Sequence, residues 1–214
     1  TSAVQRGATL RMIPVPIDPK FIKLVDAVVF THEHLDHCHV DSVRPIYENT
    51  KSPFVGAKAV VDQVAGWGFN RDRLSELNAG SSLDVKDVRV YAVESYDPLA
   101  KGAIMLLLEA AGVNIFHSGD AWYFPGFAKV GEKWRVDLAF IGVANNPPGR
   151  HTYMTPCDFL RAARDLKARK AIPTHWDIWK PTYMDPSVVQ RVAEVLMPDL
   201  DIVVLRVGDR LTYP

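Results

Sequence analysis

The chain has 214 residues, of which 48% are hydrophobic and 23% are charged, and its 25 Lys and Arg balance its 25 Asp and Glu. These values predict one globular domain over residues 1–214, and a formal net charge of zero argues against broad contact with nucleic acid or an anionic membrane. No apolar run approaches the roughly 20 residues that span a bilayer, two cysteines are too few for a disulfide framework, and no signal-peptide pattern is present, so we expect a cytoplasmic protein.

The first half of the chain predicts an irregular start followed by short elements. Three prolines punctuate residues 1–25, and the apolar run at 27–30 then predicts a buried strand. Three elements are expected next: a short helix capped by Asp41 and ending near Tyr47, a strand over 53–56, and a helix over 57–65 that Gly66 and Gly68 stop.

The rest of the chain predicts hairpins and then β-α alternation. Strands near 88–92, 104–108 and 113–116 follow one another closely, so we expect antiparallel pairing. Strands over 136–143, 170–174 and 201–207 then alternate with two helices, one opened by Thr155 and one running from Asp185 to Met197. This order predicts mixed sheets covered by helices, a layered α/β sandwich.

A cluster of metal-ligand side chains follows the first strand. His32, His34, Asp36 and His37 fall within six residues. On a strand continuing past Thr31, the first two imidazoles would point the same way, and the other two side chains would follow as the chain turns. Imidazole and carboxylate groups suit zinc, iron or manganese, so the cluster predicts a centre for one or two divalent ions.

Further ligand candidates follow two other predicted strands. Asp120 comes after V-N-I-F-H-S-G, and His175 comes after I-P-T. Each would be presented at a strand end in the same way as His34. His117 has two interpretations that the sequence leaves open: a partner that orients a ligand, or a buried histidine satisfied by the backbone.

The three motifs T-H-E-H-L-D-H, H-S-G-D and P-T-H-W-D resemble those of the metallo-β-lactamase fold superfamily of hydrolases. Within it, G-W-G at 66–68, Asn146-Pro147 and D-I-W at 177–179 are similar to the L-ascorbate-6-phosphate lactonases. The resemblance extends from Asp26 to the C-terminus. It implies an αββα four-layer sandwich with the metal site at one edge of the sheets, and an enzyme associated with manganese that opens a lactone ring by hydrolysis.

The resemblance also implies a set of ligands. His32 and His34 would hold one metal position, Asp36, His37 and His175 would hold the other, and Asp120 would bridge the two or serve a single ion.

The chain departs from the superfamily pattern in two places. Many members have another histidine near the end of the strand that reads Y-A-V-E-S-Y-D here; Asp97 is the candidate replacement, and as an oxygen ligand it would favour manganese over zinc. The alternative is that Asp97 is a turn residue before Pro98 and that one ion binds. Only 31 residues precede His32, and they are poor in strand signal, so the N-terminal strands typical of the superfamily are expected to be missing or curtailed.

The predicted chemistry is metal-assisted hydrolysis of a small molecule such as a phosphorylated sugar lactone, with Asp36 or Asp120 orienting the water and moving its proton. Four loop residues are candidates for binding the substrate: Asn146, Arg150, His151 and Lys180. A phosphodiester substrate is the alternative within the same fold, and a non-catalytic metal-binding module is the alternative from another class. The sequence leaves the oligomeric state open, a homo-oligomer included.

Overall fold

The computed structural model describes residues 11–213, so residues 1–10 of the expected irregular start lie outside the described residues. Its strands form two sheets. The smaller sheet is parallel, in the order β1 (Val28–Val29), β2 (Phe54–Gly56) and β3 (Leu74–Glu76). The larger sheet has the order β10-β9-β8-β7-β6-β5-β4, and its strands are β4 (Ser82–Val85), β5 (Val88–Glu94), β6 (Ile104–Ala110), β7 (Val113–His117), β8 (Leu138–Gly142), β9 (Lys170–Thr174) and β10 (Asp201–Ile202).

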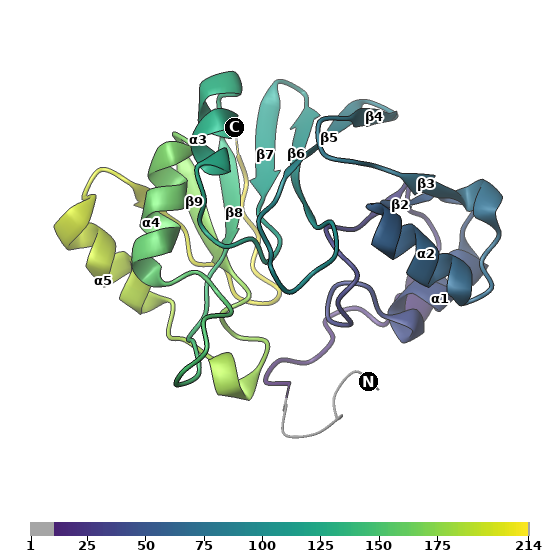
Figure 1. Ribbon diagram of the computed structural model, residues 1–214, viewed down its shortest axis with the longest axis horizontal. Helices are drawn as coiled ribbons and strands as arrows, with labels where there is room; N and C mark the ends of the chain where they lie inside the picture. The colour runs from purple at the N-terminus through teal and green to yellow at the C-terminus, as the bar shows by residue number, and fades with distance from the viewer. Residues whose placement is uncertain (1–10, 214) are drawn as a thin grey trace.

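The helices cover the outer faces of the two sheets. They are α1 (Val40–Asn49), α2 (Lys58–Gly66), α3 (Gly126–Lys133), α4 (Pro156–Asp165) and α5 (Ser187–Leu196). In Figure 1, α1 and α2 lie outside the small sheet, and α3, α4 and α5 lie outside the large one. None of the helices described for residues 11–213 has the length and apolarity needed to cross a membrane.

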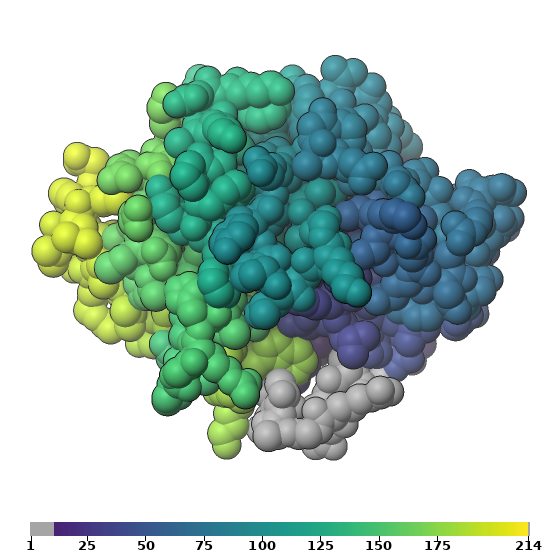
Figure 2. Space-filling model, in the orientation of Figure 1, coloured from purple at the N-terminus to yellow at the C-terminus, as the bar shows by residue number. Residues whose placement is uncertain are grey.

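Three apolar clusters hold these four layers together. One fills the space between α1, α2 and the small sheet and includes Phe54 and Val60. A second joins the two sheets through residues such as Val55 and Leu106. The third packs α3, α4 and α5 on the large sheet. This arrangement is the expected αββα sandwich, and Figure 2 shows the two halves of the sequence lying against each other across one face of the molecule.

Local signals explain the best-predicted elements. Helix α4 begins with a capping box, in which the Thr155 hydroxyl accepts from the Asp158 backbone N–H and the Asp158 carboxylate accepts in return. Its predicted apolar stripe is buried against the large sheet. For α1 the prediction was wrong in detail, because His39 rather than Asp41 is the N-cap and its Nδ1 accepts the Asp41 backbone N–H.

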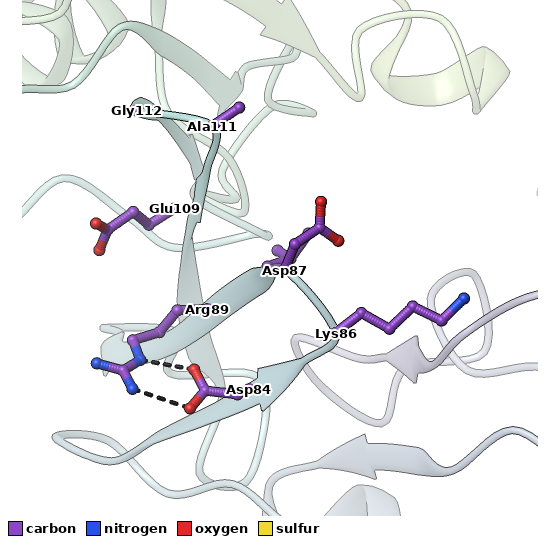
Figure 3. Close-up of a pocket in the computed structure, with 8 residues that line it drawn as sticks. Asp84, Lys86, Asp87, Arg89, Glu109, Ala111 and Gly112 are labelled. Carbon is purple, nitrogen blue, oxygen red and sulfur yellow. Dashed lines mark hydrogen bonds and ion pairs between the residues drawn. The ribbon is translucent and has the colours of Figure 1, made fainter.

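The predicted hairpins are confirmed. Strands β4 to β7 pair antiparallel in sequence order, and two-residue turns join β4 to β5 and β6 to β7. Ala111 and Gly112 in the second turn both have positive φ, as a tight hairpin requires. Figure 3 shows these turns around a shallow surface cavity of about 270 Å³, beside the ion pair of Arg89 with Asp84. The turns lie at the opposite end of the strands from the residues that follow β5 and β7.

Several strands are shorter than predicted, among them β8, which covers Leu138–Gly142 instead of 136–143. β10 ends at Ile202 rather than Val207, because it pairs only with the first two residues of β9. β1 ends at Val29, so the expected strand through His34 does not form. Instead the chain makes a tight turn after His34, in which the backbone N–H groups of His37 and Cys38 both donate to the His34 carbonyl.

Candidate metal centre

The predicted ligands meet at one edge of the two sheets. Strands β5, β7 and β9 run in the same direction within the large sheet, so the residues that follow them share an edge. Asp97 follows β5, Asp120 follows β7, and His175 follows β9. The turn from His32 to His37 after β1 lies against the same edge, since the Ile104 N–H at the start of β6 donates to the Thr31 carbonyl.

Asp36, His37, Asp120 and His175 form the first of two groups. Each offers one ligand atom, and these atoms lie within 4.8 Å of one another. Asp120 Oδ2 lies 3.2 Å from His37 Nε2 and 3.5 Å from His175 Nε2, and Asp36 Oδ2 lies 3.4 Å from the same His175 nitrogen. The four side chains, which come from three separate segments of the chain, therefore surround one small volume.

His32, His34 and Asp97 form the second group under the same limit of 4.8 Å. His32 Nε2 also lies 3.8 Å from Asp120 Oδ2, so one carboxylate oxygen faces both groups. The structure thus brings together all seven residues singled out as ligands, and Asp97 lies with His32 and His34.

The buried atoms of these residues fit a divalent cation. Among the described residues, several site atoms are buried without a hydrogen-bond partner: His32 Nε2, His37 Nε2, Asp97 Oδ2, Asp120 Oδ1 and both ring nitrogens of His175. Burying so many unsatisfied polar atoms is unfavourable. A cation with nitrogen and oxygen ligands would satisfy them, and this donor set suits zinc or manganese.

Neighbouring groups fix the orientation of the ligands. Thr31 Oγ1 lies 3.0 Å from His32 Nδ1, and if Nδ1–H donates to it, Nε2 presents its lone pair to the site. The indole Nε1–H of Trp179 donates to Asp36 Oδ2 at 2.9 Å. His34 donates through Nε2 to the Leu99 carbonyl at 2.9 Å, which leaves Nδ1 as its ligand nitrogen.

Backbone conformation is unusual at two points of the site. His175 has a φ of +69°, a strained value for a residue with a β-carbon, and such residues concentrate at functional sites. Gly119 has a φ of +56°, and a Cβ added there would lie 3.1 Å from the Thr31 Cβ. Glycine therefore allows the loop that carries Asp120 to approach the residue that orients His32.

At His32 and Asp120 the electrostatics favour the protonation states that bind metal, whereas at His175 the effect of burial, which alone would lower the pKa, is outweighed by the carboxylates of Asp120 and Asp36, which raise the pKa. Burial, reinforced by the nearby His37, lowers the pKa of His32 to about 3, so its imidazole is neutral at neutral pH. Burial alone would raise the pKa of Asp120, but His175 and His37 outweigh it and lower this pKa to about 2. Neutral imidazole and ionised carboxylate are the forms that ligate cations.

A cavity of about 470 Å³ opens beside the ligands. Asp36, Asp97 and Asp120 line one part of it. The other lining residues are the apolar or aromatic Leu99, Pro147, Tyr153, Trp179 and Pro181 and the polar His34, Arg150, Thr152 and Thr182. This shape and lining are typical of a site that binds a small molecule.

The structure separates the four candidates for substrate binding. Arg150 lines the cavity. The His151 ring packs on Trp122, with ring centroids 4.4 Å apart. Lys180 is exposed and does not line the cavity. The Asn146 amide is occupied by the backbone of Thr152 and Tyr153 and so holds a loop.

The candidates for substrate binding did not include two aromatic residues of the cavity. Trp179 and Tyr153 line it, and only the D-I-W motif pointed to the first. Burial, followed by the charges of Asp120, Asp36 and Asp97, raises the pKa of Tyr153 above its ordinary value, so its phenol is protonated. For His117 the open question is answered by the backbone, since the Gly119 N–H donates to its Nδ1 at 2.9 Å.

Comparison with known proteins agrees with this architecture. A family model described as the β-lactamase superfamily domain matches residues 2–176. The chain is 30% identical to the probable L-ascorbate-6-phosphate lactonase UlaG of Salmonella paratyphi B, over 96% of this chain and 65% of that protein, and 31% identical to the same protein of Salmonella choleraesuis with the same coverage. The chain thus spans about 65% of the length of the curated relatives it matches.

Solved structures show the same fold at low identity. An isothiocyanate hydrolase from Delia radicum gut bacteria aligns over 97% of this chain and 84% of its own, with a TM-score of 0.77 and 16% identity. The metallo hydrolase Igni18 of Ignicoccus hospitalis covers 89% of this chain and 80% of its own, with a TM-score of 0.74 and 19% identity. The chain therefore belongs to the β-lactamase superfamily and has the metallo-β-lactamase fold.

Proposed function

We propose that this chain is a metal-dependent hydrolase that opens the lactone ring of a phosphorylated sugar acid such as L-ascorbate 6-phosphate. The observation that carries the proposal is the convergence of buried, unpartnered histidine and aspartate atoms beside a cavity large enough for a small molecule. The 30% identity to the probable L-ascorbate-6-phosphate lactonases supports the choice of substrate.

The ligands divide into two metal positions. His32, His34 and Asp97 would hold one ion, and Asp36, His37 and His175 would hold the other, since the ligand atoms of each set lie within 4.8 Å of one another. Asp120 serves both, because its Oδ2 faces imidazoles of the two groups. Three carboxylates in the set favour a hard divalent ion, so manganese is preferred to zinc.

A divalent ion in this site would supply a water of lowered pKa and an electrophile for the carbonyl group. The protein must orient that water and receive its proton. Asp36 Oδ2 already accepts the Trp179 indole N–H, whereas Asp120 Oδ1 is buried and has no hydrogen-bond partner among residues 11–213. Asp120 Oδ1 is therefore the better candidate for the proton acceptor, and Asp36 is the better candidate for a fixed ligand.

Arg150 is the residue proposed to bind the phosphate. It is the one Lys or Arg of the described part of the chain that lines the cavity. Its guanidinium can pair with phosphate through two parallel hydrogen bonds.

The test uses the full chain loaded with manganese. Ring opening of L-ascorbate 6-phosphate should be lost on chelation, return with added manganese and be abolished in Asp120→Asn. Arg150→Ala should raise KM for the phosphorylated lactone while leaving KM for an unphosphorylated lactone unchanged. Turnover of bis(p-nitrophenyl) phosphate without any lactone hydrolysis would replace the proposal with a phosphodiesterase. Bound metal with no turnover of either substrate would favour the non-catalytic module.

One observation supports a second candidate substrate. Much of the cavity lining is apolar or aromatic, which suits an apolar electrophile better than a polyhydroxylated ring. The structural likeness to an isothiocyanate hydrolase extends over 97% of the chain. Benzyl isothiocyanate belongs in the same assay, and its hydrolysis in the absence of lactonase activity would select this reaction.

A further inference from the structure

Tyr153 lies in the cavity beside the candidate ligands. Its ring centroid is 4.9 Å from that of His175, and the ring planes are tilted by 35°. It lines the same cavity as Asp36, Asp97 and Asp120. Within residues 11–213 its hydroxyl makes no hydrogen bond to another side chain or to the backbone. A phenol that only filled space against His175 would need no hydroxyl at this position.

Asn146 holds the backbone that carries Tyr153. Its Oδ1 accepts from the backbone N–H groups of Thr152 at 2.6 Å and Tyr153 at 2.9 Å, and its Nδ2 donates to the Tyr153 carbonyl at 2.9 Å. On the other side, the Trp122 indole N–H donates to the Thr152 carbonyl at 3.1 Å. The loop after β8 is therefore closed at its base, and Tyr153 is presented from a fixed backbone.

The residue that follows Tyr153 also fixes the base of this loop. Met154 is buried in the main core, and its carbonyl accepts from the Ala144 N–H at 3.4 Å. Side chains held in this way lose little conformational freedom when a substrate arrives. Hydrogen-bond donors that are fixed in advance contribute most to stabilising charge that develops during a reaction.

Building on the proposed hydrolysis, we propose that Tyr153 is a catalytic residue whose phenol O–H donates a hydrogen bond to the carbonyl oxygen of the substrate as negative charge develops there. Asn146 is the positioning residue that holds it. The phenol keeps its proton throughout, so no bond of Tyr153 forms or breaks. The site would thus have an oxyanion donor supplied by the protein.

The test compares Tyr153→Phe with the parent chain, both loaded with manganese. Phenylalanine keeps the packing on His175 and removes only the hydroxyl. We expect kcat on L-ascorbate 6-phosphate to fall about 100-fold with KM changed less than threefold, because the lost donor acts in the transition state. Methylphosphonate, a small tetrahedral oxyanion, should bind about tenfold more weakly by calorimetry. Manganese content should be unchanged.

A matched control is Tyr183→Phe, which removes a hydroxyl from a tyrosine that packs on Trp176 outside the catalytic cavity. It should leave kcat and methylphosphonate binding as in the parent. If Tyr153→Phe also leaves both within twofold of the parent, the inference is overturned while the hydrolase proposal stands. If the parent hydrolyses none of the substrates, the hydrolase proposal fails, and methylphosphonate binding alone decides the role of the phenol.

Asn146 is tested by a double-mutant cycle. If it acts through Tyr153, Asn146→Ala should lower kcat in the parent but have little further effect in the Tyr153→Phe background. Equal losses of kcat in both backgrounds would show that Asn146 supports the fold in general and would remove it from the proposal.

Discussion

The proposed role of Asp97 as a ligand predicts that this centre holds two ions rather than one. Its Oδ1 accepts the Leu99 backbone N–H at 2.9 Å, and its Oδ2 is buried without a partner among the described residues. Asp97→Asn keeps the shape and the Leu99 hydrogen bond but removes the negative charge. We therefore expect the parent to bind two manganese ions per chain and the variant to bind one.

The size of the effect follows from the composition of the group. Without the Asp97 carboxylate, only the imidazoles of His32 and His34 remain for that position, apart from the shared Asp120. Removing a residue that only hydrogen-bonds to a metal ligand typically lowers metal affinity about 10- to 100-fold. Removing a charged ligand should therefore lower the affinity for the ion at this position by more than about 100-fold. The other ion should be affected far less.

Elemental analysis after dialysis, followed by competition with a chelator, measures both quantities. Asp62→Asn is the control, because Asp62 is an exposed carboxylate on α2 that pairs with Lys58. In addition, Asp97→His should shift selectivity from manganese toward zinc, since an imidazole replaces an oxygen ligand. An Asp97→Asn variant that binds as many ions as the parent, with the same affinity, would refute the assignment of Asp97 as a ligand.

Three further predictions concern groups around the ligands. Trp179→Phe removes the indole donor to Asp36 and should weaken metal binding about 10- to 100-fold in the chelator competition. Gly119→Ala places a Cβ against Thr31 at a positive φ and should lower the free energy of unfolding by about 2 kcal/mol in urea. Burial and the nearby His37 lower the pKa of His117 to about 4, so the unfolded chain takes up this proton first as the pH falls. Stability is then present above about pH 6.5 and lost toward pH 4, and His117→Asn should remove about 2 kcal/mol of the difference in unfolding free energy between pH 7 and pH 5, measured without metal.

The Gly119 prediction has a matched control in the chain. Gly112→Ala also places alanine at a positive φ, but with open space around the Cβ, so it should lower the unfolding free energy by only about 1 kcal/mol. Equal losses at the two glycines would show that the Thr31 contact is unimportant. Unchanged metal affinity in Trp179→Phe, or an unchanged pH slope in His117→Asn, would contradict the other two predictions.

Helices and strands could be predicted from the sequence where the residues that determine them are consecutive in the chain. Helix α4 and strand β9 were predicted well because a capping box and a short apolar run are written in consecutive residues. The lengths of β1 and β10 were not, because a strand ends where its neighbour stops pairing with it.

The same distinction applies to the site. Ligand types at the ends of strands could be predicted, because strands that run in the same direction in one sheet deliver their ends to one edge. His32 and His34 do offer ligand atoms to one group, as the alternation predicted, but the strand expected there does not form. Tyr153 could not be found, because its place in the cavity depends on the Asn146 hydrogen bonds across a loop.

The Trp179–Asp36 hydrogen bond joins positions 143 residues apart, and it lies at the point where the two sheets meet. A partly folded chain offers a cation only the local His32–His37 fragment, and the high-affinity set exists only after the second half has docked. A divalent ion held by this set would therefore bind the native state selectively and stabilise the docked arrangement. The melting temperature should consequently rise with the concentration of added divalent ion.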